Sequence, residues 1–159
     1  MVGYRYAISK ATGVTLQYID INYPGAKVNF ETDFSEFSIA LDHHSLFKYN
    51  DSIVTSLAFS PEYYAKTGHM WRFDARYDIP LNQDFGLMVA GGALKVEDKQ
   101  AFFHVWGNDQ KDHYYDWKAG ITSNLFGLRS ELFYADNSGI NPNVSSMKSR
   151  VVFSVTKLF

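Results

Sequence analysis

The stretch 69–79 alternates between hydrophobic and charged residues. Successive side chains of a β-strand point to opposite faces, so this alternation predicts a strand with one apolar face and one charged face. The charged face carries both signs in turn, with Arg72, Asp74, Arg76 and Asp78. Such a strand can lie between an apolar environment and an aqueous one.

Similar stretches recur along the whole chain, and no helical periodicity separates them. Two of the stretches contain local irregularities. The polar residues of 14–23 point to both faces, and Gly91-Gly92 interrupts 85–96, so we expect a bulge in the first and a kink or bulge in the second. The sequence predicts nine antiparallel strands joined by hairpins, at residues 3–10, 14–23, 34–42, 53–60, 69–79, 85–96, 113–123, 128–135 and 148–159.

The connections between these strands alternate between long and short. Tight turns fall near residues 12, 50, 81 and 124. The longer connections are 24–33, 61–67, 97–111 and 136–147. In an antiparallel sheet, alternate connections lie at the same end, so the long loops would gather at one rim and the tight turns at the other. This arrangement is typical of a transmembrane β-barrel.

Composition is compatible with such a barrel. Aromatic residues make up 17% of the 159 residues, which suits aromatic girdles at both membrane interfaces. The mean hydropathy of −0.23 resembles that of a soluble protein, but every second residue of a barrel strand faces the lumen. No apolar run approaches the roughly 18 residues of a membrane helix. The opening MVGYRYAISK has no apolar signal-peptide core, so we expect a cleaved signal or an incomplete N-terminus.

Several functions lack a signal in the sequence. A formal net charge of −2 gives no electrostatic reason to expect nucleic-acid binding. Cysteine is absent, and adjacent pairs such as His43-His44 would point to opposite faces of a strand, so we predict no metal site. No phosphate-binding loop or catalytic constellation is apparent. We therefore predict that the chain is not an enzyme and has no cofactor.

The charged faces fit either of two environments. In a soluble β-sandwich they would meet bulk water, and in a barrel they would line the lumen. No differently patterned element is available to cover the apolar faces, which favours the barrel. The predicted lumen-lining residues, which would form any solute path, are Arg72, Asp74, Arg76, Asp78, Asp116, Lys118, Arg129, Glu131 and Arg150.

The C-terminal stretch KSRVVFSVTKLF also alternates and ends on an aromatic residue. It resembles the terminal signal of outer-membrane barrels, which the barrel assembly machinery recognises. Phe153, Val155 and Phe159 would carry that signal. Lys157 stands where a further apolar residue is expected, although a lysine near the membrane interface can extend its ammonium group to water.

Several stretches together resemble the TorF family of outer-membrane porins. The resemblance spans nearly the whole chain and implies a bacterial outer-membrane location. Family members carry a signal peptide and further strands before the position of Gly3, so it also implies about three missing strands and a barrel of about twelve. The similar stretches are GYRYAIS at 3–9, INYPGAKVNF at 21–30, SLAFSPEYYAKTGHMWRFDARYDIPL at 56–81, YYDWKAGIT at 114–122 and SRVVFSVTKLF at 149–159.

We therefore expect residues 1–159 to form one all-β domain, the last nine strands of an antiparallel transmembrane β-barrel. The expected function is a porin-like channel for passive diffusion of small hydrophilic solutes. The expected partners are outer-membrane lipid, the assembly machinery and those solutes. Two alternatives stay open: a non-conducting barrel that serves as an anchor, and a soluble β-sandwich that binds a partner.

Overall fold

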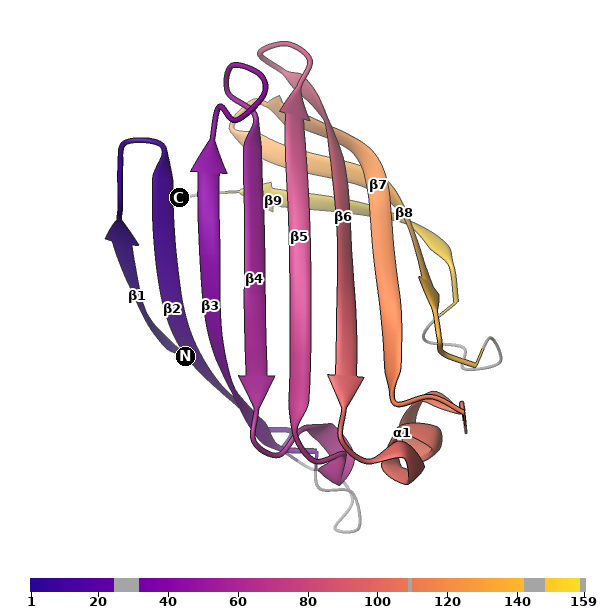
Figure 1. Cartoon of the computed structure of the whole chain (residues 1–159). Helices are drawn as coiled ribbons and strands as arrows, with labels where there is room; N and C mark the ends of the chain where they lie inside the picture. The colour runs from indigo at the N-terminus through magenta and orange to yellow at the C-terminus, as the bar shows by residue number, and fades with distance from the viewer. Residues whose placement is uncertain (25–31, 109, 142–147, 158–159) are drawn as a thin grey trace.

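The computed structural model describes residues 1–24, 32–108, 110–141 and 148–157. Nine strands form a single antiparallel sheet in which each strand pairs with the next one along the chain (Figure 1). The predicted all-β class and the predicted strand count are confirmed. The strands are β1 (Val2–Ala7), β2 (Thr12–Ile21), β3 (Phe34–His44), β4 (Ser52–Ser60), β5 (Met70–Pro80), β6 (Phe85–Val96), β7 (His113–Leu125), β8 (Leu128–Ser138) and β9 (Arg150–Lys157).

The sheet is strongly curved but not closed. Figure 1 shows β8 and β9 passing behind the middle strands, so that the sheet has a concave and a convex face. Within the described residues, β1 and β9 do not pair with each other. The tight turns lie at one end of the strands, and the connections that contain helical segments lie at the other. No helix in the described part of the chain is long and apolar enough to cross a membrane.

The strand pairing is regular where irregularity was expected. Every residue of β2 from Thr12 to Ile21 pairs in sequence with β3, so the predicted bulge in 14–23 is wrong. The polar residues of that stretch simply divide between the two faces. Gly91 and Gly92 also pair in unbroken register with both neighbouring strands, so the predicted bulge there is wrong too. Gly92 has a different role, described below.

The sequence analysis expected a long loop without regular structure at 97–111, and the structure differs from this expectation. It contains the helix α1 (Lys99–Trp106). The Asp98 side chain caps the helix by accepting hydrogen bonds from the backbone N–H groups of residues 100 and 101. Gly107 ends it in the left-handed conformation, with a φ of 71°. A short 3₁₀ segment, η1 (Tyr64–Lys66), lies in the β4–β5 connection.

The hydrophobic core sits at the loop end of the sheet rather than along it. Phe102 and Trp106 are one helical turn apart, so they project together from α1. They pack on side chains that β5 and β6 direct toward the concave face. We call this group the rim cluster, and its buried members are Met70, Leu94, Val96, Phe102, Trp106 and Ile140. Burial of these side chains fixes α1 over one end of the concave face.

A buried carboxylate organises the opposite, turn end. The Asp51 side chain is 0% exposed and accepts hydrogen bonds from the backbone N–H groups of residues 46, 47 and 48 and from the Tyr77 hydroxyl, at 2.6–2.9 Å. Burial alone would raise the pKa of this carboxyl group. The four hydrogen bonds outweigh burial and lower the pKa to about 2.

This lowered pKa predicts a pH-dependent stability. The contribution of Asp51 is present above its ordinary pKa of 3.8 and is lost as the pH falls toward 2. Asp51→Asn should lower the urea midpoint of unfolding at pH 7, and the gap from wild type should narrow between pH 4 and pH 2. Asp84→Asn, a charge-matched control in the exposed β5–β6 turn, should have little effect. A gap that stays constant down to pH 2 would contradict the assignment.

Candidate functional site

The charged residues predicted to line a lumen share one face of the sheet. The register places Arg76 on β5, Lys118 on β7 and Arg150 on β9 in one cross-strand row, with alanines between them on β6 and β8. Ion pairs that skip over neighbouring strands can form only on the concave side, so this face is the concave one. It carries all nine predicted residues: Arg72, Asp74, Arg76, Asp78, Asp116, Lys118, Arg129, Glu131 and Arg150.

The first ion cluster joins β5 to β7. The Arg72 guanidinium donates to Asp74 on its own strand, at 2.7 and 2.9 Å, and to Asp116 on β7, at 3.0 and 3.3 Å. It also donates to the Tyr114 hydroxyl at 3.2 Å. The side chain of Arg72 is only 25% exposed. The guanidinium makes a bidentate contact with Asp74 and a further contact with Asp116. Together the two carboxylates hold it in one orientation.

A glycine makes this cluster possible. Gly92 lies on β6, directly between Asp74 and Asp116 in the register. A Cβ atom at Gly92 would lie 2.5 Å from Asp74 Oδ1 and 2.9 Å from Arg72 Nη2. The missing side chain therefore provides the space in which the Arg72 guanidinium crosses β6.

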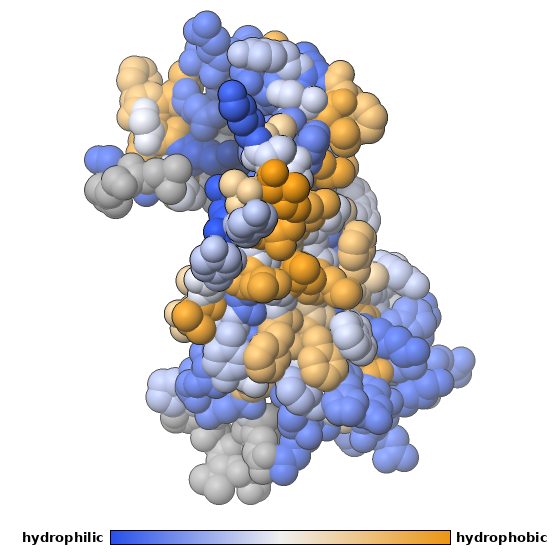
Figure 2. Space-filling view, turned by 60° about the vertical axis from the view of Figure 1, so that its left-hand side comes forward, coloured by the Kyte–Doolittle hydropathy of each residue, from blue (hydrophilic) through white to orange (hydrophobic). Residues whose placement is uncertain are grey.

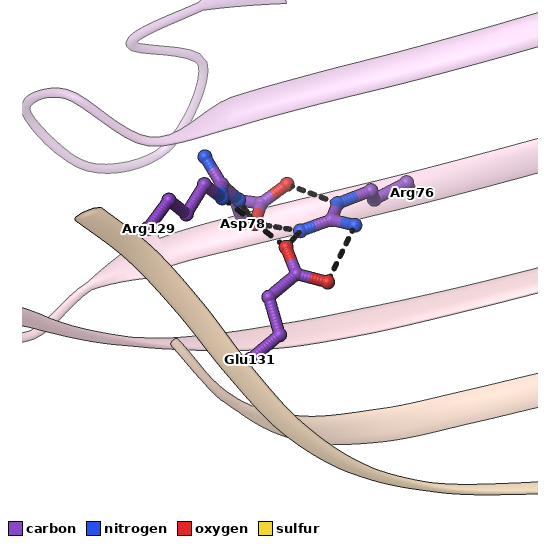
Figure 3. Close-up of polar contacts among 4 residues, drawn as sticks. All are labelled: Arg76, Asp78, Arg129 and Glu131. Carbon is purple, nitrogen blue, oxygen red and sulfur yellow. Dashed lines mark hydrogen bonds and ion pairs between the residues drawn. The ribbon is translucent and has the colours of Figure 1, made fainter. Parts of the chain in front are cut away.

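The second ion cluster joins β5 to β8 (Figure 3). Arg76 donates to Asp78 at 2.6 and 2.7 Å and to Glu131 at 2.7 Å. Arg129 donates to the same two carboxylates, at 2.9 and 3.1 Å. β5 and β8 are three strand spacings apart, which is about 14 Å along a flat sheet. These contacts therefore exist only because the sheet curves back on itself.

Lys118 and Arg150 differ from the other cations of this face. The Lys118 ammonium group lies 5.0 Å from the centre of the Phe133 ring, and no described carboxylate forms an ion pair with it. Arg150 donates to the backbone carbonyl of Lys148 at 3.2 Å. Lys118, Lys148 and Arg150 line a cavity of about 290 Å³ between β7 and β9, together with Asp116 and Asp136. The sequence analysis had predicted Lys118 and Arg150, but not Lys148, as lining residues.

The sequence analysis missed other members of the concave face. Arg5 on β1 pairs with Asp42 on β3 at 2.8 Å, across Gly13 of β2. As in the β5–β7 cluster, the guanidinium and the carboxylate meet in the space above a glycine, here next to the β1 edge of the sheet. A signal was present, because both charges lie opposite apolar faces in strands 3–10 and 34–42.

The convex face is apolar and exposed on all nine strands. Figure 2 shows hydrophobic residues gathered across the middle of the visible side, with hydrophilic residues toward its ends. Rings of neighbouring strands pack against each other on this face, such as Phe59 and Trp71 at 4.8 Å. Its exposed side chains include Tyr4, Leu16, Phe37, Ile39, Leu57, Trp71, Phe73, Val89, Trp117, Ile121, Leu132, Val151, Phe153 and Val155.

Two of the three predicted assembly-signal residues can be placed. Phe153 and Val155 lie on the convex face of β9 and are 67% and 51% exposed. Phe159 lies outside the described residues. Lys157 shares their face but pairs with Leu128, beside the β7–β8 turn. It therefore lies at the end of the strand, where the sequence analysis placed a lysine at the membrane interface.

Within the described ranges, no group of three His, Cys, Asp or Glu side chains could hold a metal ion. Comparison of the chain with protein-family models, with curated proteins and with solved structures finds no match. The functional argument therefore rests on the geometry of the two faces.

The role assigned to Gly92 can be tested against its neighbour. Gly92→Ala should displace the Arg72–Asp74 pair and lower the free energy of unfolding by about 1–3 kcal/mol, as overpacking does. Gly91→Ala is the matched control, because its Cβ would meet only atoms at 3.4 Å or beyond. It should be neutral or slightly stabilising. Equal losses for both variants in equilibrium unfolding would refute the proposed role.

Proposed function

We propose that the nine strands are part of an outer-membrane β-barrel that acts as a porin-like channel for small hydrophilic solutes. The observation that carries this proposal is the contrast between the two faces. The convex face is apolar and exposed on every strand, and the concave face holds the ion clusters. Soluble monomers rarely expose apolar patches beyond a few hundred Å², whereas a membrane barrel requires such a surface.

The open edges of the sheet support closure by further strands. The outer edges of β1 and β9 have no partner strand among the described residues. In lipid, each unpaired backbone group costs several kcal/mol, so a spanning sheet must close on itself. Strands that pair with both edges would complete a barrel. The resemblance to the TorF family implies about twelve strands in total, an even number as in other bacterial barrels.

The filling of the concave face favours a narrow path. The two ion clusters lie along this face between the rim cluster and the turns, and α1 covers the loop end through the rim cluster. A barrel of about twelve strands is intermediate between a side-chain-filled barrel and an open porin. We therefore expect a small conductance.

A non-conducting anchor is the second candidate function, and the position of α1 favours it. Phe102 and Trp106 are 0% and 4% exposed and lie against inward-facing residues at the loop end. If α1 seals that end, the barrel would not conduct. A soluble β-sandwich is less well supported, because the nine strands form one sheet in sequence order and not two packed sheets.

Membrane contact of the convex face can be tested with two adjacent residues of β4. Leu57 is exposed on the convex face, and Ser56 lies on the concave face opposite Asp74. Leu57→Arg should lower the free energy of unfolding in lipid vesicles by about 2–4 kcal/mol if it faces the bilayer midplane. Ser56→Arg places the same charge beside a carboxylate and should cost much less. Similar losses for both variants would contradict the assignment of the two faces.

Conduction can be tested in planar bilayers with the full-length protein. The double variant Arg72→Gln/Arg76→Gln removes two positive charges and leaves the carboxylates of both clusters without those partners. The reversal potential in a salt gradient should shift toward cation preference, and the shift should be larger at low salt, where screening is weaker.

Lys10→Gln/Lys99→Gln is the charge-matched control, because both lysines are exposed outside the strands. It should shift the reversal potential much less. Folded wild-type protein without any conductance would favour the anchor. An equal shift in the double variant and its control would show that the two arginines do not line the path.

A further inference from the structure

A carboxylate and an ammonium group that are close on one strand stay apart on the concave face. Asp116 and Lys118 are two residues apart on β7, so they point to the same side. At the same spacing Arg72 pairs with Asp74, so the distance along a strand does not prevent contact. Among the described residues no carboxylate forms an ion pair with Lys118, whose ammonium group lies over the Phe133 ring, 5.0 Å from its centre.

The two charged groups are held in opposite directions along β7. Arg72 contacts the Asp116 carboxylate from the loop side, at 3.0 Å, because Arg72 shares a cross-strand row with Tyr114. The Phe133 ring lies on the turn side of Lys118 and attracts its ammonium group. Two residues of a strand span about 7 Å. The opposite contacts therefore leave a gap between a negative and a positive group.

A cavity of about 390 Å³ lies beside both groups, between the first ion cluster and Arg76. Ser56 and Ala90 are among the small residues of its wall. Its volume falls within the range of about 300–1,000 Å³ that is typical of ligand pockets. Arg72 and Arg76 also line it, but each already pairs with two carboxylates. Of the described residues that line this cavity, Lys118 is the one cation without a carboxylate partner.

The carboxylate at the other side of the gap can accept a further donor. Asp116 accepts from one nitrogen atom of Arg72, at 3.0 and 3.3 Å, and its side chain is 35% exposed. A carboxylate has about four acceptor positions, so it has capacity for a second charged group. An anion in the cavity would meet Asp116 as well as Lys118, and so would a cation. A solute that carries both charges satisfies both residues.

We propose that this cavity binds a small zwitterionic solute, an α-amino acid. The carboxylate of the solute accepts from the Lys118 ammonium group, and its ammonium group donates to Asp116. Both contacts are charge-assisted hydrogen bonds. Partial burial of Lys118 and Asp116 lessens screening of these charges by solvent. The inference rests on the proposed function, because it places the site on the wall of the solute path.

Calorimetric titration of detergent-solubilised full-length protein with L-alanine at low salt tests the site. Propionate and ethylamine are matched probes, because propionate lacks the ammonium group of alanine and ethylamine lacks its carboxylate. Saturable binding of alanine is expected. Each probe should bind about tenfold more weakly, because each loses one charge-assisted contact. Propionate or ethylamine that binds as tightly as alanine would overturn the zwitterion site.

A variant of the lysine separates the two contacts. Lys118→Met removes the ammonium group without leaving a described carboxylate unpaired, so the variant should fold. It should weaken the binding of alanine and of propionate about tenfold and should not weaken that of ethylamine. Lys99→Gln, at an exposed lysine of α1, should bind as wild type does. Equal binding of alanine by Lys118→Met and wild type would refute the site.

The outcomes distinguish this site from the channel itself. If folded wild-type protein shows no saturable binding of alanine, the site is overturned even if the protein conducts ions in planar bilayers. Binding that depends on Lys118 would support the site even if no current is measured. In that case the barrel would hold an amino acid without transporting it.

Discussion

Ion pairs that reach across neighbouring strands are the interaction on which the shape of the concave face depends. Arg76 and Arg129 share the carboxylates of Asp78 and Glu131, although β5 and β8 are not neighbours (Figure 3). On a flat sheet these side chains would lie too far apart to touch. Curvature and pairing are therefore coupled, because a change that flattened the sheet would break the contacts between β5 and β8 and leave each arginine only the carboxylate on its own strand.

Glycine on the intervening strands is what allows this coupling. Gly13 and Gly92 leave room for guanidinium groups above the sheet. Gly120 acts differently, because a Cβ atom there would collide with the backbone of β8 at Leu132 and Phe133. It lets β7 and β8 approach closely beside the place where β8 turns back toward β5. Individually, partly exposed ion pairs contribute little to stability, so we assign the networks mainly a role in specifying the shape.

The period-two alternation was sufficient to predict the strands and to place the nine predicted charged residues on one face, because successive side chains of a strand point to opposite faces. It could not predict which charges meet, because contacts across two or three strands depend on curvature. Gly92 was predicted to mark an irregularity, because the sequence does not show that the Arg72 and Asp74 side chains of the adjacent strand fill the space above this glycine. The sequence analysis missed the helix α1, although the sequence contains signals for it. Asp98 caps its start, Gly107 caps its end, and Phe102 and Trp106 lie on one of its faces. An eight-residue helix is too short to show a clear period.

The order of layers along the concave face bears on what could pass through a barrel built from it. From the loop end, the apolar rim cluster comes first, then the β5–β7 cluster with one cation and two carboxylates, then the row that holds Lys118 and Arg150. The charge-balanced β5–β8 cluster follows near the turns. An anion that enters from the loop end would meet the net negative β5–β7 cluster first and the positive row second. A cation would be attracted by the first layer and repelled by the second. Neither sign meets a continuous favourable path along the described wall, so a channel built from it is expected to select only weakly between anions and cations.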